Sequence, residues 1–291
     1  MVEPILKWAG GKRQLLDEIK SKFPESYDSF YEPFFGGGAV FFDIEPSSGR
    51  INDMNTRLIN FYRVVRDNPE ELIEICQNFD DPTSEPDSNR RYNDVNRKGK
   101  SIDEYYYQQR ELFNCRPNNE QFDRVEEAAL LLYLNRTCYN GLYRENQSGE
   151  FNTPIGRYSN PDWIRSKQVR SASSVLTNIS IDNNDFTYLE NYCSSGDFVY
   201  IDSPYEPMSA TADFTKYSAD GFGQQDQKRL LEFAKKLDEK GVHIVLSNSG
   251  VMYDKYKEIG FTVDMIDAKR SISSDGDNRG DVEEILAYNT T

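Results

Sequence analysis

The stretch DFVYIDSPYEP, residues 197–207, decides the fold class of this chain. Residues 197–201 have the composition of a short buried strand, and the two prolines that follow prevent the strand from continuing. Two earlier stretches have the same order of strand, turn and helix, namely SFYEPFFGGGAVFFDI at 29–44 and GRINDMNTRLINFYRVV at 49–65. Repeated units of this kind predict an α/β fold, a sheet with helices on both faces.

The chain continues this pattern after residue 207. Amphipathic spacing predicts a helix over 226–239, and apolar runs predict strands over 242–246, 261–266 and 282–288.

Residues 55 to about 185 differ, because helical patterns such as FDRVEEAALLLYLNR predominate there. They also include a loop rich in Pro, Asp, Ser and Asn, DDPTSEPDSNRRYND, and a polar stretch with glycines. We therefore expect a sheet domain made of residues 1–57 and 186–291. A second domain, residues 58–185, is inserted into it and consists of helices and a hairpin at about 136–158.

Composition excludes several classes of function. Forty-nine acidic against 34 basic residues give a net charge of −15, which argues against a general coat for nucleic acid or anionic membranes but permits a local basic groove. The chain has neither a run of 18 apolar residues nor a signal peptide, so we expect a cytoplasmic protein. The four cysteines are widely spaced, and His243, the single histidine, lies in the apolar run GVHIVLSN, so we expect no zinc site and no Ser/His/Asp triad.

Asp202, Ser203, Pro204 and Tyr205 carry the most informative chemistry. They follow a strand, where open α/β sheets bind ligands, and they offer a carboxylate, a backbone carbonyl and an aromatic ring within one turn. A planar exocyclic amine fits this set, since its two N–H groups can donate to Asp202 and to the Ser203 carbonyl while Tyr205 stacks on the ring. An ordinary strand end with a proline turn is the alternative.

The glycines of FFGGGAVFF, residues 34–42, would let a ligand approach a helix N-terminus closely. The pattern from Gly36 is GxGxxF, and Phe41 stands where a dinucleotide fingerprint needs Gly or Ala. A nucleoside without a pyrophosphate therefore fits better, and Asp53, at the end of the next strand, is placed to accept hydrogen bonds from ribose hydroxyls. A purely structural turn is the alternative.

Two further segments have less specific signals. KWAGGK, residues 7–12, places two lysines and an indole around two glycines and could hold a carboxylate; a capped helix with surface lysines is the alternative. Residues 136–170 contain six basic and three acidic side chains, so that this segment is +3 and the rest of the chain −18. Its arginines, amides and aromatic rings suit DNA contact, and a solvated hairpin is the alternative.

Six strings together resemble the Dam-type DNA adenine-N6 methyltransferases of the D12 class. In order they are KWAGGK, YEPFFGGGAVFF, INDMN, YLNRTCYNGLYRENQSGEFNTPIGRY, DFVYIDSPYEPMSATADFTKY and KRSISSDGDNRGDVEEILAYN. The resemblance runs from residue 5 to about 288 and is least diagnostic over 70–120. It implies a Rossmann-like class I methyltransferase sheet, S-adenosylmethionine as cofactor without a metal, and double-stranded DNA as partner, usually with GATC as target.

The resemblance also implies a role for each matched residue. The cofactor would contact Trp8, Lys12, Phe35, Gly36, Gly38, Asp53 and Asp202, and the flipped adenine would lie against Asp202, Ser203, Pro204 and Tyr205. Tyr139 and Asn140 would fill or contact the opened base stack, Arg144 would read guanine, and Leu142 and Pro154 would contact thymine. Asn146, Asn152 and Arg157 would contact the DNA backbone, and Lys7 would lie near the target.

One position departs from the family pattern. The family's catalytic string is normally DPPY, and Ser203 replaces the first proline here. A serine keeps the backbone carbonyl but lacks the fixed φ of proline, so we expect the change to affect turnover more than binding.

These observations predict a monomeric, site-specific DNA methyltransferase that modifies adenine N6, in GATC, by base flipping and direct displacement. Its 1–57 and 186–291 portion would be catalytic and its 58–185 portion would recognise the target, in the cytoplasm of a prokaryotic cell or a virus-infected host. Two alternatives stay open. One is a DNA-binding homologue with weakened catalysis, and the other is a methyltransferase acting on protein amides, which also present a planar NH₂ group.

Overall fold

The computed structural model describes residues 2–85, 104–115, 123–205, 222–268 and 282–290. Three parts of the sequence interpretation lie outside these residues: most of the loop expected at 80–94, the end of the DFVYIDSPYEPMSATADFTKY string including Pro207, and residues 269–281 of the last family string.

Within the described residues, seven strands form one sheet in the order β3-β2-β1-β4-β5-β7-β6. The strands are β1 (Phe30–Glu32), β2 (Gly49–Asn52), β3 (Ile179–Asp182), β4 (Phe198–Asp202), β5 (His243–Ser249), β6 (Thr262–Ala268) and β7 (Val282–Tyr288). Strands β1 to β5 pair in parallel, and β7 pairs antiparallel with both β5 and β6. The predicted α/β sheet is confirmed, and the arrangement is consistent with a class I methyltransferase fold.

Strand β4 shows why these residues form the middle of the sheet. Phe198 and Tyr200 belong to the core on one face, whereas Val199 and Ile201 belong to the core on the other. Because successive side chains in a strand point to opposite faces, a strand that is apolar at every position must be covered on both sides.

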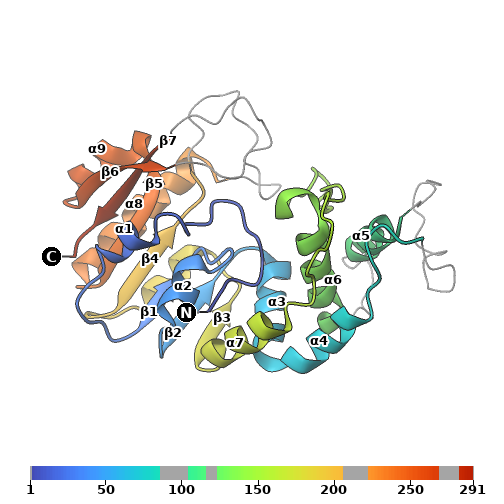
Figure 1. Cartoon of the computed structure of the whole chain (residues 1–291). Coiled ribbons are helices and arrows are strands. Elements are labelled where there is room, and N and C mark those ends of the chain that lie inside the picture. Colours follow the sequence, from blue (N-terminus) through green and yellow to red (C-terminus); the bar gives the residue numbers. More distant parts are fainter. Residues whose placement is uncertain (1, 86–103, 116–122, 206–221, 269–281, 291) are drawn as a thin grey trace.

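The helices cover both faces of the sheet and extend beyond it to one side (Figure 1). They are α1 (Leu16–Lys20), α2 (Ala39–Ile44), α3 (Thr56–Asp67), α4 (Pro69–Gln77), α5 (Tyr105–Cys115), α6 (Arg124–Thr137), α7 (Ser166–Leu176), α8 (Gln224–Glu239) and α9 (Tyr253–Glu258), with 3-10 helices η3 (Tyr139–Gly141), η4 (Phe186–Asn191) and η6 (Gly250–Met252). Helices α3, α4, α6 and α7 gather on the side away from β6 and β7. This cluster is the helical region expected between the second and third strand units.

Local sequence determines where the long helices of this region begin. The Asn55 side chain accepts hydrogen bonds from the N–H groups of Arg57 and Leu58 and so caps α3. Asp123 caps α6 in the same way. Helix α6 is buried on nearly all sides, which explains its continuous apolar run, and it packs against α3, α4 and α5.

Strand β3 changes the domain boundary drawn from the sequence. Residues 179–182 fall in the expected inserted domain, yet they pair with β2 and form one edge of the sheet. The sequence interpretation missed this strand because it has only four residues, ISID, and two polar side chains. The division into a catalytic and a recognition domain otherwise remains a prediction, since one apolar cluster runs from the sheet into α3, α4, α5 and α6.

Candidate functional site

The order of the strands locates the topological switch point of the sheet. The chain runs outward from β1 to β2 in one direction and from β4 to β5 in the other, so the order reverses between β1 and β4. Open α/β sheets bind ligands at such a switch point, outside the carboxyl ends of the strands. The glycine turn at 36–38 follows β1 and the 202–205 loop follows β4, so the two motifs are neighbours at this point.

Asp202 is held by two donors. The Lys12 ammonium lies 2.9 Å from Asp202 Oδ1, and the Ser247 hydroxyl donates a hydrogen bond of 2.8 Å to the same oxygen. Lys12 is 6% exposed and Asp202 is 22% exposed. Burial is the largest single influence and lowers the pKa of Lys12, but the charges of Asp202, Tyr200 and Glu284 and the hydrogen bond to Asp202 together outweigh it, so the pKa is raised above its usual value. Oδ2 of Asp202 has no donor among the residues that the structure describes.

Tyr205 lies beside the same ammonium. The Lys12 Nζ atom is 4.9 Å from the centre of the Tyr205 ring, so the carboxylate and the aromatic ring converge on one cation. The Tyr205 hydroxyl donates to Glu284 Oε2 over 2.9 Å, and Glu284 is buried in β7. Burial, and then the charges of Asp202 and Glu284, raise the pKa of Tyr205 well above its usual value. The Tyr205 phenol is therefore neutral, and its hydroxyl is held by Glu284 of β7.

Ser203 and Pro204 differ in their hydrogen bonds. Ser203 is 2% exposed, and its hydroxyl has no hydrogen-bond partner among the described residues. The Pro204 carbonyl accepts a hydrogen bond of 3.0 Å from the Gln227 side chain of α8.

The glycine turn packs around Trp8. A Cβ atom added at Gly36 or Gly37 would lie within 3 Å of the Trp8 side chain, so these glycines make room for the indole itself. Gly38 has φ +66 and precedes α2. The Phe35 side chain points into the core and packs edge-on against Phe41 and Tyr62, so a ligand would meet only its backbone.

Asp53 supports the turn from the end of β2. Its carboxylate accepts hydrogen bonds of 2.9 Å from the backbone N–H groups of Gly36 and Asn55. Burial raises the pKa of Asp53, and these two N–H donors partly oppose the rise. Each carboxylate oxygen has two acceptor positions, so Asp53 keeps acceptor positions for further donors.

Glu32, at the end of β1, is a residue that the sequence interpretation missed. It is 3% exposed, and its Oε2 atom has no partner among the described residues. Burial, and then the nearby charge of Asp202, raise its pKa well above 4.5, and Asp53 adds to the effect. The signal was present, since an acid inside the apolar string FYEPFF needs a reason to be buried.

The loop at residues 7–12 joins this site to the segment after α6. Trp8 stacks on Tyr143 with ring centres 5.1 Å apart, and its side chain also lies against Gly36 and Gly37 of the glycine turn. The Lys7 ammonium donates to the Tyr158 hydroxyl over 3.0 Å, and the Lys7 backbone N–H donates to Asn135. One short loop therefore contacts the 202–205 loop, the glycine turn and the expected DNA-binding segment.

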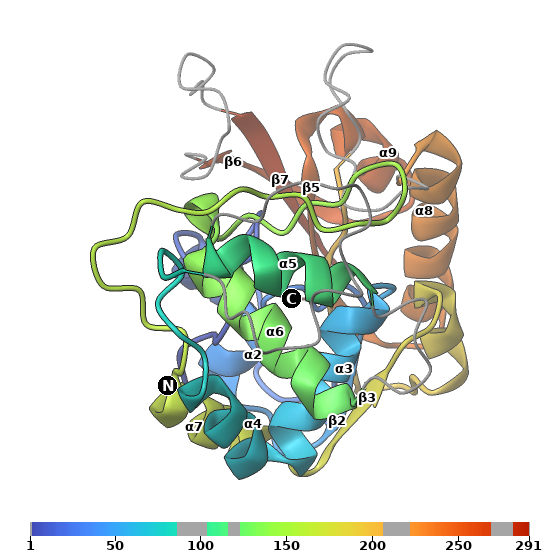
Figure 2. The same cartoon turned by 90° about the vertical axis from the view of Figure 1, so that its right-hand side faces the viewer.

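The hairpin expected at 136–158 is looser than predicted. The segment folds back on itself in an antiparallel way, with isolated bridges between Cys138 and Ile155 and between Glu145 and Phe151 and further backbone hydrogen bonds between its two arms, such as that from the Asn152 N–H to the Arg144 carbonyl. Its described residues form a 3-10 turn, η3, and no named strand. The segment packs on α5, where the Asn114 amide donates to the Phe151 carbonyl (Figure 2). Its own Gly and Pro residues explain the lack of regular pairing.

The predicted DNA-contacting residues lie at the surface of this segment to different degrees. Exposed are Tyr139, Asn140, Arg144, Pro154 and Arg157; partly buried are Lys7, Leu142, Asn146 and Asn152. The Arg144 Nε atom donates to Asn152 Oδ1 over 2.7 Å. The Asn146 side chain accepts hydrogen bonds from the backbone N–H groups of Ser148 and Glu150, so it shapes the turn.

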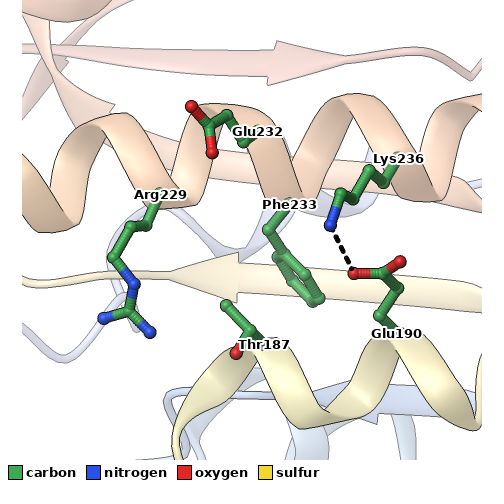
Figure 3. Close-up of a pocket in the computed structure, with 6 residues that line it drawn as sticks. All are labelled: Thr187, Glu190, Arg229, Glu232, Phe233 and Lys236. Carbon is green, nitrogen blue, oxygen red and sulfur yellow. Dashed lines mark hydrogen bonds and ion pairs between the residues drawn. The ribbon is translucent and has the colours of Figure 1, made fainter.

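Figure 3 shows a surface pocket away from these motifs, between η4 and α8. It is lined by Thr187, Glu190, Arg229, Glu232, Phe233 and Lys236. Lys236 pairs with Glu190 at 3.0 Å, and Arg229 pairs with Asp185 at 2.7 Å. Because both cations of the pocket already have partners and no residue predicted from the sequence lines it, the switch point of the sheet is the stronger candidate.

Comparison with known proteins shows to which family the chain belongs. A sequence model of the D12 class N6 adenine-specific DNA methyltransferases matches residues 8–275. The chain belongs to this family. It is an adenine-specific DNA methyltransferase, and membership implies the use of S-adenosylmethionine and a DNA substrate. The resemblance stated from the six strings is confirmed.

The relatives of this D12 methyltransferase match it over nearly the whole chain. The type II methyltransferase M1.LlaDCHI of Lactococcus lactis subsp. cremoris is 40% identical, over 99% of this chain and 95% of its own length. The type II methyltransferase M.MjaIII of Methanocaldococcus jannaschii is 38% identical, over 99% of both chains. The DNA adenine methylase of Escherichia coli strain K12 is 35% identical, over 97% of this chain and 93% of its own. These matches remove the alternative of a protein-amide methyltransferase.

Two negative findings apply only to the part of the D12 methyltransferase that the structure describes. Its helices include none with the length and apolar character needed to cross a membrane. Its His, Cys, Asp and Glu side chains form no group of three or more suited to a metal ion.

Proposed function

We propose that this D12 methyltransferase methylates N6 of adenine in GATC sites of double-stranded DNA, after flipping the target adenine out of the duplex. One observation carries the proposal: Asp202 and Tyr205 converge on the Lys12 ammonium at the switch point of the sheet. The Asp202 carboxylate thus already accepts one N–H donor on Oδ1 beside an aromatic ring, and its second oxygen faces no donor among the described residues.

We call the space bounded by Asp202, the Ser203 carbonyl and the Tyr205 ring the target slot. This slot would position the amino group of the adenine through several acceptors. Oδ2 of Asp202 is open to one N–H of the adenine amine, the Ser203 carbonyl would accept the other, and the Tyr205 ring would stack on the base. Two hydrogen bonds drawn to one side turn the nitrogen lone pair out of conjugation with the ring, which makes N6 nucleophilic. A strong base is then unnecessary.

The charges around the switch point fit S-adenosylmethionine, which carries a positive sulfonium and an ammonium group. Glu32, Asp53 and Asp202 lie at the ends of β1, β2 and β4, and the Glu32 carboxylate has an unpartnered buried oxygen. A cation would relieve the cost of that burial. Glu32 would take the ammonium group, Asp53 the ribose hydroxyls, and Trp8 and the 36–38 turn would line the nucleoside, with Lys12 nearby.

When bound, the cofactor supplies a methyl group on a positively charged sulfur. Asp202 aligns N6 for in-line attack on that methyl and accepts a hydrogen bond that strengthens as positive charge develops on N6. Alignment and electrostatic stabilisation by the protein are then the main catalytic contributions.

Recognition of GATC would rest on the segment between α6 and α7. Because Nε of Arg144 is held by Asn152, its two terminal nitrogens stay available for a bidentate contact with guanine O6 and N7. Tyr139 is 45% exposed and precedes Asn140, which has a left-handed φ of 55, so the pair forms a protruding turn suited to enter an opened base stack. Leu142 and Pro154 would contact thymine, and Asn146, Arg157 and Lys7 would contact the DNA near the target.

A methyl-transfer assay tests the proposal. Duplexes with one GATC site, and matched duplexes in which each base of the site is changed in turn, are incubated with S-adenosylmethionine labelled in its methyl group. We expect label on N6 of adenine in the GATC duplex alone, with the variant Asp202→Ala as the inactive control. Equal labelling of every adenine-containing duplex would contradict the GATC assignment. Label on cytosine would contradict the assignment of the 202–205 loop as an adenine site.

A further inference from the structure

The carbonyl of Pro204 is the end of a chain of buried amides that reaches back to β5. The Ser249 backbone N–H donates to Asn248 Oδ1 over 2.8 Å, and Asn248 Nδ2 donates to Gln227 Oε1 over 3.0 Å. Gln227 Nε2 then donates to the Pro204 carbonyl over 3.0 Å. Asn248 and Gln227 are 0% and 1% exposed, so water does not compete for these bonds.

The direction of this chain is set by its two backbone ends. A backbone N–H can only donate and a carbonyl can only accept, so each amide has a single orientation that pairs both of its ends. If either amide were turned over, two N–H groups or two oxygens would face each other in a buried place. The Pro204 carbonyl is therefore tied to the rigid end of β5 through a polar path with one arrangement.

The chain of amides acts where the family pattern is altered. Ser203 precedes Pro204 and lacks the ring that would fix its φ, and its hydroxyl has no partner among the described residues. The Pro204 carbonyl belongs to the peptide unit that leads to Tyr205, so holding it restricts the loop directly after the Ser203–Pro204 bond. A hydrogen bond from α8 thus restrains the loop at Pro204, whereas a proline at 203 would fix φ one residue earlier.

We propose that Gln227, anchored by Asn248, is a positioning residue that aligns the 202–205 loop for methyl transfer and compensates for Ser203. The inference rests on the proposed function of that loop. Gln227 would contact neither adenine nor cofactor, so its loss should lower the rate of the chemical step and leave the binding of both substrates nearly unchanged.

The test uses an isosteric variant with a matched control. Gln227→Glu keeps an acceptor for Asn248 and cannot donate to Pro204 once its carboxyl is ionised, so the rates are compared at a pH high enough to ionise a buried carboxyl. Gln225→Glu makes the same change at an exposed position of the same helix. We expect the single-turnover rate of Gln227→Glu, on whichever duplex the wild type prefers, to fall by about 10- to 100-fold, the size expected when a reacting group is slightly misplaced. The dissociation constants for S-adenosylmethionine and for DNA should change by less than about threefold.

A second variant breaks the chain of amides at Asn248, and it tests the inference if Gln227→Glu does not fold. Asn248→Asp keeps the acceptor for the Ser249 N–H and loses the donor to Gln227, so we expect a smaller loss of rate in the same direction. A double variant gives the sharpest evidence. When Ser203→Pro is combined with Gln227→Glu, the loss caused by the second change should shrink to roughly threefold, because two restraints on one loop are not additive.

Three outcomes would overturn the inference: a rate for Gln227→Glu equal to that of Gln225→Glu, a loss of rate matched by an equal loss of cofactor affinity, or full additivity with Ser203→Pro. Failure of the proposed function is a separate result, because it appears in the wild-type arm as the wrong base or the wrong site.

Discussion

Lys12 and Asp202 form a partly buried ion pair at the proposed target slot, with Nζ 2.9 Å from Oδ1. The pair links a loop near the N-terminus to the carboxyl end of β4. It holds the carboxylate in place before any substrate arrives, so little reorganisation is needed when an amine donates to the second oxygen.

The first prediction concerns the charge of Asp202. Asp202→Asn keeps the shape of the side chain but removes the negative charge, and we expect the single-turnover rate to fall by about 100- to 1000-fold, as for other residues that stabilise charge in a transition state. Filter binding to a GATC duplex should show nearly unchanged affinity. A variant that keeps the wild-type rate would show that the Asp202 charge does not stabilise N6.

The second prediction separates the Tyr205 ring from its hydroxyl. Tyr205→Phe keeps the stacking ring, so transfer should stay within about tenfold, whereas Tyr205→Ala should lose far more. Tyr205→Phe leaves the buried Glu284 carboxylate without its donor, so unfolding in urea should show about 1–3 kcal/mol less stability. Adding Glu284→Gln should restore much of that stability. Equal rates for the Phe and Ala variants would argue against stacking.

The third prediction concerns base reading. Arg144→Ala should lose about 1–3 kcal/mol of discrimination against duplexes with the guanine replaced, in competition assays at fixed salt. Asn152→Ala, which frees Nε, should lose a smaller part. Arg157→Ala is the matched control, because a phosphate contact should weaken binding to all duplexes equally and reduce the salt dependence. The same uniform loss for Arg144→Ala would show that it contacts only phosphate.

The fourth prediction concerns pH. The pKa of Glu32 is raised above 4.5 in the folded protein, so the folded state binds its proton more tightly than the unfolded chain does. Stability is therefore lost as pH rises above about 4.5, by about 1.4 kcal/mol for each unit of the rise in pKa. Glu32→Gln removes this loss, and its melting temperature should exceed that of the wild type at pH 8 and approach it near pH 4.

The control for this prediction is Glu25→Gln, an exposed position where no such difference should appear. Addition of S-adenosylmethionine should stabilise the wild type more than Glu32→Gln, because a cation pairs with the ionised carboxylate. A difference between variant and wild type that does not vary with pH would contradict the buried, unpaired state of Glu32.

The strands and the main motifs were predictable because their signals are local. An apolar run that ends at Asp202 and a glycine turn after a strand can be recognised within a few residues, and both lie where expected. Parallel strands also place their carboxyl ends at one edge, which made the proximity of these motifs predictable. Strand β3 was not predictable in this way, because its place depends on pairing with β2 rather than on its own four residues.

The contacts that hold the site were hidden for a different reason. Gln227, Ser247 and Glu284 come from α8, β5 and β7, and nothing in their own neighbourhoods connects them to residues 202–205. The glycines of the 36–38 turn were expected to let a ligand approach, which stays a prediction, and only the folded chain shows that those at 36 and 37 also make room for Trp8. Such pairings between distant residues are decided only when the helices and strands pack.

By itself, then, the sequence determined the class of fold, the family and the residue types available for the chemistry, because these depend on composition, short-range pattern and the order of motifs. The tertiary structure alone decided that Asp202 meets Lys12, that Tyr205 rests on Glu284 and that the Pro204 carbonyl is tied to β5. The physical reason is that buried polar groups must find partners, and those partners are chosen by packing across the whole sheet.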